Sequence, residues 1–294
     1  MPSPNPQILS SATWKRQAAA HRARAREWTE PFRQRRARGK RHPVYDFLFV
    51  YYRYSPAKLE AWHPGLGVAL ETDPSERTLF RKHYRSVDGV VELDRATLDA
   101  REHPRLEFIL RLAQAIEARP AQFGCSGLHE WAMVYRGTAE GEIRHGESLP
   151  LRLSQPEVDA VVEKGPIVCS HYDAFRFFTS SARPFNRLQP KKETRVELEQ
   201  CGCLHTNMDL YRWATESMPW VGTELLWACW KLALRARELD MQASAYDCRS
   251  LGYEPIQIET PAGRAEYERR QREISEAAKP LRRELITRLE EVLS

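Results

Sequence analysis

The pair His171 and Asp173 follows directly after a short apolar segment, residues 166–169. If that segment is a strand, alternate residues point to one face, so the imidazole and the carboxylate lie side by side. Such a pair can supply two ligands of a two-histidine, one-carboxylate iron site. It equally suits a general acid or base. The structural alternative is that Asp173 accepts local hydrogen bonds at a helix start while His171 is a half-buried residue with satisfied hydrogen bonds.

A second group of candidates lies at the start of a predicted helix, residues 205–217. Cys201, Cys203 and His205 alternate along the chain, and a fourth ligand would complete a zinc site. His205 and Asp209 are four residues apart, so they share one face of the helix. The alternative interpretation is a loop with two inert thiols, followed by a helical His–Asp pair.

Two further His–acid pairs are less suggestive. His129 and Glu130 are adjacent in an aromatic segment, residues 125–136, and adjacent helical residues point about 100° apart. We therefore expect one of them in the core and the other at its rim rather than both in one small site. His42 and Asp46 are spaced to pair across one helical turn.

Several common motifs are missing from the sequence: G-x-x-x-x-G-K-[ST], G-x-G-x-x-G, G-x-S-x-G and H-E-x-x-H. Nucleotide hydrolysis by a P-loop, a dinucleotide-binding fold and α/β-hydrolase chemistry therefore lack their usual marks. Six cysteines in 294 residues are too sparse for a disulfide scaffold. With no apolar run long enough to span a membrane and no apolar N-terminal signal, we expect a cytoplasmic protein with no membrane partner.

Positive charge is concentrated in residues 15–41, which hold eleven Lys or Arg and only two Glu, whereas the whole chain carries +5. Such a segment can bind the phosphates of nucleic acid, and the nearby Trp14 and Trp28 can stack on bases. The alternative is that it docks on an acidic face of its own domain, because the rest of the chain is net negative. The candidate nucleic-acid-binding residues are Arg22, Arg24, Arg26, Arg33, Arg35, Arg36 and Arg38.

The elements that must position these residues are mostly helices. We predict a mainly α fold with a small β element: a disordered tail over residues 1–10, a basic helical arm over 11–41 and a single compact globular domain over 42–294. Pro31 is expected to end the helix of the arm. The predicted helices cover residues 44–54, 56–62, 104–118, 154–163, 205–217, 221–239 and 262–293, and the predicted strands cover 90–93, 151–153, 166–169 and 255–259.

Six motifs carry a resemblance to a known family. They are H-P-V-Y-D-F-L-F-V-Y-Y (42–52), W-H-P-G (62–65), C-S-G-L-H-E-W-A-M-V-Y-R (125–136), S-H-Y-D-A-F-R-F-F-T (170–179), C-L-H-T-N-M-D-L-Y-R-W (203–213) and I-E-T-P-A-G-R-A-E-Y (258–267). Together they resemble a bacterial family of about this length that is labelled 3-methyladenine DNA glycosylase. The similarity extends from about residue 21 to the C-terminus, with Cys201 standing where a Pro is expected.

The resemblance implies a DNA N-glycosylase that releases an alkylated purine such as 3-methyladenine, with DNA as its partner and no cofactor. Base excision needs a flipped nucleotide held between aromatic rings, a positive surface for phosphates and a carboxylate near the sugar. We assign the carboxylate to Asp173 and its partner to His171. The further catalytic candidates are Asp209, His205 and Glu130, and the candidate base-stacking residues are Tyr172, Tyr211 and Trp213.

Two other functions stay open at this point. The first is a metal-dependent enzyme acting on a small molecule, with non-haem iron or zinc held by His171, Asp173 and His205 if their segments converge. The second is a non-enzymatic protein that binds nucleic acid or another partner through the basic segment.

Overall fold

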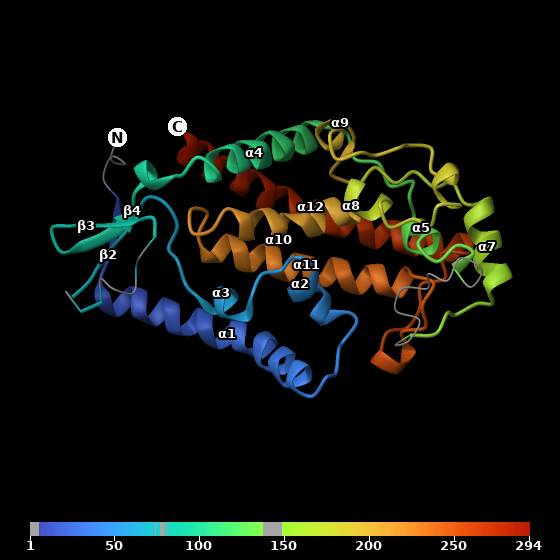
Figure 1. Cartoon of the computed structure of the whole chain (residues 1–294), viewed down its shortest axis with the longest axis horizontal. Coiled ribbons are helices and arrows are strands. Elements are labelled where there is room, and N and C mark those ends of the chain that lie inside the picture. Colours follow the sequence, from blue (N-terminus) through green and yellow to red (C-terminus); the bar gives the residue numbers. More distant parts are fainter. Residues whose placement is uncertain (1–5, 74, 77–79, 81, 138–148) are drawn as a thin grey trace. The chain divides into compact units, whose positions relative to one another are not determined.

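The computed structural model describes the chain except for residues 1–5, 74, 77–79, 81 and 138–148. It is mainly helical with one small sheet, which confirms the predicted fold class (Figure 1). The chain divides into two compact units, and four helices contribute residues to both. Unit 1 contains Met1–Arg111, Tyr211–Trp230 and Arg283–Ser294, and unit 2 contains Leu112–Leu210 and Lys231–Arg282.

The sheet of unit 1 has four short strands in the order β1-β2-β4-β3. Strand β1 is parallel to β2, and the other neighbours are antiparallel. The β3–β4 hairpin turns at Asp88 and Gly89, both with positive φ, as a two-residue hairpin loop requires. The strands are β1 (Gln7–Leu9), β2 (Val68–Glu71), β3 (Tyr84–Val87) and β4 (Val90–Leu93).

Only β4 of these strands was predicted from the sequence. The expectation of disorder is wrong at residues 7–9, because the edge of β2 supplies a backbone partner that no local sequence pattern reveals. Gln7, the first of the three paired residues of β1, donates its amide to the Gly67 carbonyl at 3.0 Å. An edge strand of three residues lacks the length for a periodic signal.

Helix α1 (Ser11–Ala37) is continuous through Pro31, where the sequence predicted its end. One face of α1 is buried along its whole length, and its side chains continue beyond the proline; they are Trp14, His21, Ala25, Thr29 and Phe32. Packing of this face therefore offsets the lost backbone hydrogen bond. In Figure 1, α1 (blue) runs alongside α3 (Pro56–Glu60), and the β1–β2 end of the sheet lies near the start of α1.

The short helices of unit 1 follow the sequence prediction. Helix α2 (Tyr45–Tyr51) is the aromatic segment, and α3 (Pro56–Glu60) begins with Pro56 at its first turn. Ser55 caps α3, because its hydroxyl accepts a hydrogen bond from the Lys58 amide at 3.3 Å. A 3₁₀ turn, η2 (Arg95–Thr97), leads towards α4.

The remaining helices belong to unit 2 or are shared by both units, and five of the predicted ranges are confirmed among them. Helix α12 passes Pro280 without a break. The shared helices are α4 (Glu102–Ala118), α10 (Leu204–Glu216), α11 (Thr223–Ala243) and α12 (Pro261–Leu293). Unit 2 adds α5 (Leu128–Ala132), α7 (Gln155–Lys164), α8 (Tyr172–Phe175), η3 (Arg183–Phe185), α9 (Arg195–Leu198) and η4 (Arg249–Leu251).

Residues 166–169 were predicted to be a strand and form none. The side chain of Asn186 takes the place of a neighbouring strand: its Oδ1 accepts from the Cys169 amide at 2.7 Å and its Nδ2 donates to the Cys169 carbonyl at 2.9 Å. Residues 255–259 likewise form no strand, and 151–153 contribute only an isolated bridge between Leu151 and Tyr246. In the described part of the chain, no helix combines the length and the apolar character needed to cross a membrane.

Gly65 and Gly222, both in unit 1, allow the loop after α3 to contact the turn before α11. Both have positive φ, and a Cβ added to Gly222 would lie 2.9 Å from the Pro64 carbonyl oxygen and 3.3 Å from the Gly65 Cα. The contact is fixed by hydrogen bonds from the Leu66 amide to the Trp220 carbonyl and from the Thr223 amide to the His63 carbonyl, each 2.9 Å.

We predict that Gly222→Ala destabilises the protein more than Gly67→Ala. Both residues have φ near +80°, so each substitution incurs the left-handed penalty of roughly 1–2 kcal/mol. An added Cβ at Gly67 meets open space, whereas at Gly222 overpacking adds about 1–3 kcal/mol. Urea unfolding of both variants measures the difference. Equal losses would show that backbone conformation alone requires glycine at residue 222.

Candidate metal centre

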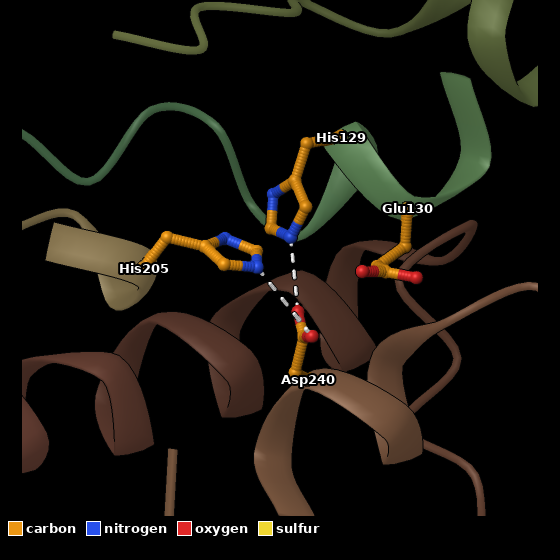
Figure 2. Close-up of side chains that lie close together, drawn as sticks. All are labelled: His129, Glu130, His205 and Asp240. Carbon is orange, nitrogen blue, oxygen red and sulfur yellow. Dashed lines mark hydrogen bonds and ion pairs between the residues drawn. The ribbon is translucent and has the colours of Figure 1, made fainter. Parts of the chain in front are cut away.

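Four acidic or imidazole side chains of unit 2 converge on one point (Figure 2). His129 and Glu130 come from α5, His205 from the first turn of α10, and Asp240 from α11. One potential ligand atom from each lies within 4.8 Å of the others. Three segments far apart in the sequence thus place two imidazoles and two carboxylates together.

Helix α5 reaches this point because of the glycine before it. Gly127 caps the helix with φ of 77°, and an added Cβ would lie 3.2 Å from a ring carbon of Tyr267 and 3.4 Å from the Ala243 Cβ. A larger residue would push α5 away from these neighbours. The adjacent His129 and Glu130 are consequently both buried, and the expectation that they would not share one site is wrong.

His129 is held through both ring nitrogens. Its Nε2 lies 2.9 Å from Asp240 Oδ1, and its Nδ1 lies 3.4 Å from the Cys125 sulfur. Burial would lower the pKa of His129, but the Cys125 sulfur and the Asp240 carboxylate outweigh burial and raise it well above its ordinary value. The pKa of Cys125 is lowered, first by a hydrogen bond from Cys169 and then by His129, against the effect of burial.

His205 is in a different state from His129. Its Nε2 is 3.7 Å from Asp240 Oδ2, beyond hydrogen-bond distance, and its ring centroid lies 4.6 Å from that of His129. Burial lowers the pKa of His205 to about 3, so the ring is neutral at pH 7 and offers a lone pair. Its side chain is 13% exposed, the largest value among the four residues, so this edge of the cluster reaches solvent.

Arg237 supplies positive charge to the two carboxylates. Its Nη1 donates to Asp240 Oδ2 at 2.8 Å and lies 3.9 Å from Glu130 Oε1. Burial and the Asp240 carboxylate raise the pKa of Glu130 to about 7. Burial would also raise the pKa of Asp240, but His205, His129 and Arg237 hold it well below its ordinary value. Asp240 is therefore the anion around which the cluster is arranged.

His171 and Asp173 do not form the predicted pair. Since residues 166–169 are not a strand, His171 instead caps α8, where its Nδ1 accepts from the Ala174 amide at 3.2 Å. Its Nε2 lies 3.3 Å from Asp209 Oδ2, while the Asp173 carboxylate accepts from Arg176 Nε at 2.9 Å. Of the predicted ligands His171, Asp173 and His205, only His205 therefore belongs to the four-residue cluster.

The two neighbouring groups still lie close together in unit 2. The ring centroid of His171 is 5.5 Å from that of His205. Asp209 also lies 3.7 Å from Arg195 Nη2, and Arg195 Nε donates to Glu199 at 2.7 Å. Asp209, predicted as a catalytic candidate, thus belongs to a buried ionic network beside the cluster.

Asp240 and Arg237 were missed by the sequence analysis because no motif surrounds them. One signal was available: Asp240 occurs on the same helical face as Ala233, Ala236 and Ala243, all buried. An acid on the apolar face of a helix is rare unless it is paired or binds a ligand.

The three predicted base-stacking residues differ in exposure. Tyr172 is half-buried in unit 2, whereas Tyr211 and Trp213, both in unit 1, are 0% and 1% exposed. Tyr211 packs between other aromatic rings of its unit, with centroids 5.4 Å from Tyr52 and 5.1 Å from Trp230. Neither Tyr211 nor Trp213 therefore presents a free ring face to a base in this structure.

Four of the seven candidate nucleic-acid-binding arginines form ion pairs within unit 1. Arg33 and Arg26 lie 2.6 and 3.8 Å from Glu60. Arg35 pairs with Asp46, and Arg24 pairs with Glu224. Arg22, Arg36 and Arg38 are exposed. These pairs favour the alternative in which the basic segment docks on acidic residues of its own chain. The backbone of His42 binds Asp46 twice: the His42 amide donates to the Asp46 carboxylate at 2.9 Å, and the His42 carbonyl accepts from the Asp46 amide at 3.0 Å.

Comparison of the chain with protein-family models, with curated proteins and with solved structures found no match. The cluster geometry is therefore the starting point for a functional proposal.

We predict that Asp240→Asn destabilises the metal-free protein by about 3–5 kcal/mol, because it leaves Arg237 and His129 buried without their main anion. Asp247→Asn is the control, because the ion pair that it removes involves an Arg249 side chain that is 64% exposed, and such pairs contribute little. Urea unfolding in the presence of a chelator measures both. Equal small losses would show that the charge of Asp240 does not organise the cluster.

Proposed function

We propose that the protein is a metal-dependent enzyme whose His129, Glu130, His205 and Asp240 hold one divalent ion, iron or zinc. The observation that carries this proposal is the convergence of their four ligand atoms within 4.8 Å, in a buried part of unit 2. Imidazole nitrogen and carboxylate oxygen are ordinary ligands of both metals, and two histidines with a carboxylate form the set typical of non-haem iron.

The separations suit a common ion. Two ligands bound at about 2.1 Å lie about 3.0–4.2 Å apart, depending on coordination geometry. His129 Nε2 and His205 Nε2 lie 2.9 and 3.7 Å from the two oxygens of Asp240. Both separations lie close to this range, and the four ligand atoms together lie within 4.8 Å, slightly more than one ion requires. A metal ion would replace the proton between His129 and Asp240, as metals do when they bind protonated ligands.

The ligand types favour a catalytic site over a structural one. Structural zinc sites are mostly rich in cysteine and closed to solvent. Here the nearby Cys125 lies against the far nitrogen of His129, where it orients the ring and leaves Nε2 for the metal. His205 is the least buried of the four, so a small substrate would approach the ion from this side.

The chain's own residues define what such a site can do. A bound divalent ion would act as a Lewis acid or, if it is iron, as a redox centre. Arg237 keeps the two carboxylates in place and provides a fixed positive charge that can face an anionic substrate. Glu130 would complete the ligand set as its second carboxylate.

We expect the purified protein to bind about one iron or zinc per chain, measured by elemental analysis and by titration of chelator-treated protein. His205→Ala should weaken binding by more than the roughly 10- to 100-fold caused by loss of an outer-shell partner. His171→Ala should keep the metal, since His171 caps α8, and the exposed His103→Ala is the control for general effects. Equal metal content in wild type and His205→Ala would overturn the proposal.

Arg237→Gln gives a second test. Without the guanidinium, the metal-free protein keeps two poorly compensated carboxylates, so its melting temperature should fall. Added metal should then stabilise this variant more than it stabilises the wild type, because binding to the native state adds stability by mass action. Thermal unfolding with and without one metal at a time measures both effects. An equal or smaller gain in the variant would contradict the assignment of both carboxylates to the ion.

The DNA N-glycosylase activity implied by the resemblance stays a prediction, with Asp173 as its proposed carboxylate. Chromatography of free base released from methylated duplex DNA tests it, with wild type, Asp173→Asn and His205→Ala compared with and without a chelator. Release that requires Asp173 and ignores the chelator would support a metal-free glycosylase. Release that requires His205 and metal would indicate that the protein is a metal-dependent DNA glycosylase.

A further inference from the structure

A second candidate site lies wholly within unit 1. It is a pocket of about 620 Å³ lined by residues from the ranges 52–63, 82–84, 102–105 and 215–219 and by Phe80. Its volume falls in the range of pockets that bind small molecules, about 300–1,000 Å³. Its lining is unusual for such a pocket, because cationic and aromatic side chains predominate.

The cations of the pocket are mostly unneutralised. Arg53, Lys58 and Arg105 are exposed, and within the described ranges none of them has a carboxylate at ion-pair distance. Lys82 differs, because it lies 2.8 Å from Glu102. The arginines of α1 mostly face acidic partners. In contrast, Arg53, Lys58 and Arg105 are cations without an acidic partner among the described residues, and they lie at a concave surface of unit 1. Such a group suits phosphate oxygens.

Aromatic rings line the same space. The ammonium of Lys58 lies 6.0 Å from the ring centre of Tyr54, and Phe80 lies 5.1 Å from Tyr84, centre to centre. Tyr84 is fixed in turn, because its hydroxyl lies 2.9 Å from Nδ1 of His63 and the two rings stack. Fixed aromatic faces beside cations favour a ligand that combines a planar ring with an anionic group.

Two lining residues have strained backbone conformations. Arg53 has φ of 53° and His83 has φ of 71°, the left-handed region that side chains other than glycine rarely occupy. His83 is held there by its neighbours: its carbonyl accepts from the Asp94 amide at 2.8 Å, and its Nε2 lies 3.1 Å from Glu102. Strained residues of this kind concentrate at ligand sites, where the surrounding structure maintains them.

We propose that this pocket binds a nucleoside monophosphate, with the three free cations around the phosphate and the half-buried Tyr52 and Tyr84 against the base. The carboxylates of Glu102 and Glu216 also line the pocket, so a compact polyanion is disfavoured. They can instead accept hydrogen bonds from the amino groups of a base or the hydroxyls of a sugar. A ligand with one charged end and a neutral polar ring matches this distribution.

The test is calorimetric titration of the full chain with AMP, GMP, CMP and UMP, in low salt with a chelator present. At least one should bind saturably, and more tightly by at least about tenfold than inorganic phosphate or the matching nucleoside alone, because only the intact ligand uses both halves of the pocket. Arg105→Gln should weaken that binding by about tenfold, the order expected for one lost charge-assisted hydrogen bond. Arg101→Gln, four residues earlier in the chain and outside the pocket, should not weaken it.

The proposal would be overturned by absence of saturable binding by all four monophosphates, or by equal weakening by Arg105→Gln and Arg101→Gln in folded proteins. Equal affinity for inorganic phosphate would do the same, because it would leave the aromatic faces without a role. The inference is independent of the metal proposal, since His205→Ala removes a metal ligand in unit 2 and should leave nucleotide binding unchanged.

Discussion

The buried negative charge of Asp240 is the constraint on which the organisation of unit 2 depends. A carboxylate that is 1% exposed incurs a large desolvation cost unless cations or hydrogen-bond donors surround it. Helix α11 itself supplies Arg237 one turn away, and α5 supplies His129. Gly127 allows α5 to pack closely against α11, and this close packing brings His129 to the Asp240 carboxylate.

A buried ionic cluster of this kind contributes little net stability compared with an apolar core, although removal of one member is costly. It therefore needs another explanation than stability. His205 strengthens that argument, because its imidazole faces Asp240 at 3.7 Å without forming a hydrogen bond to the carboxylate. Two imidazoles and two carboxylates around one point are better explained as a ligand set in which Arg237 and the His129 proton compensate the acids in the absence of an ion.

The sequence predicted most of the long elements because their periodic patterns are local. Helices α4, α10, α11 and α12 follow from apolar spacing, and α7 from its capping box. Strand β1 and the loop at residues 166–169 could not be predicted, because their hydrogen-bond partners are Gly67 and Asn186, distant in sequence. The same reason explains the site: His205 was found from its motif, but its partner Asp240 lies in another helix without one. His171 and Asp173 are close in sequence, but at the N-terminus of α8 His171 contacts Asp209 whereas Asp173 contacts Arg176.

The positive charge that is available to a ligand likewise depends on contacts between segments distant in sequence. The most basic segment of the sequence, α1, has much of its charge neutralised by Glu60, Asp46 and Glu224, so the density of arginine in a sequence is a poor guide to anion binding. Arg53, Lys58 and Arg105 come from three separate segments and form no conspicuous run. They converge on a concave surface with fixed aromatic rings, where a bound anion would be partly shielded from water and would interact more strongly than at an exposed helix. Geometry rather than composition therefore decides which cations of this protein are available to a ligand.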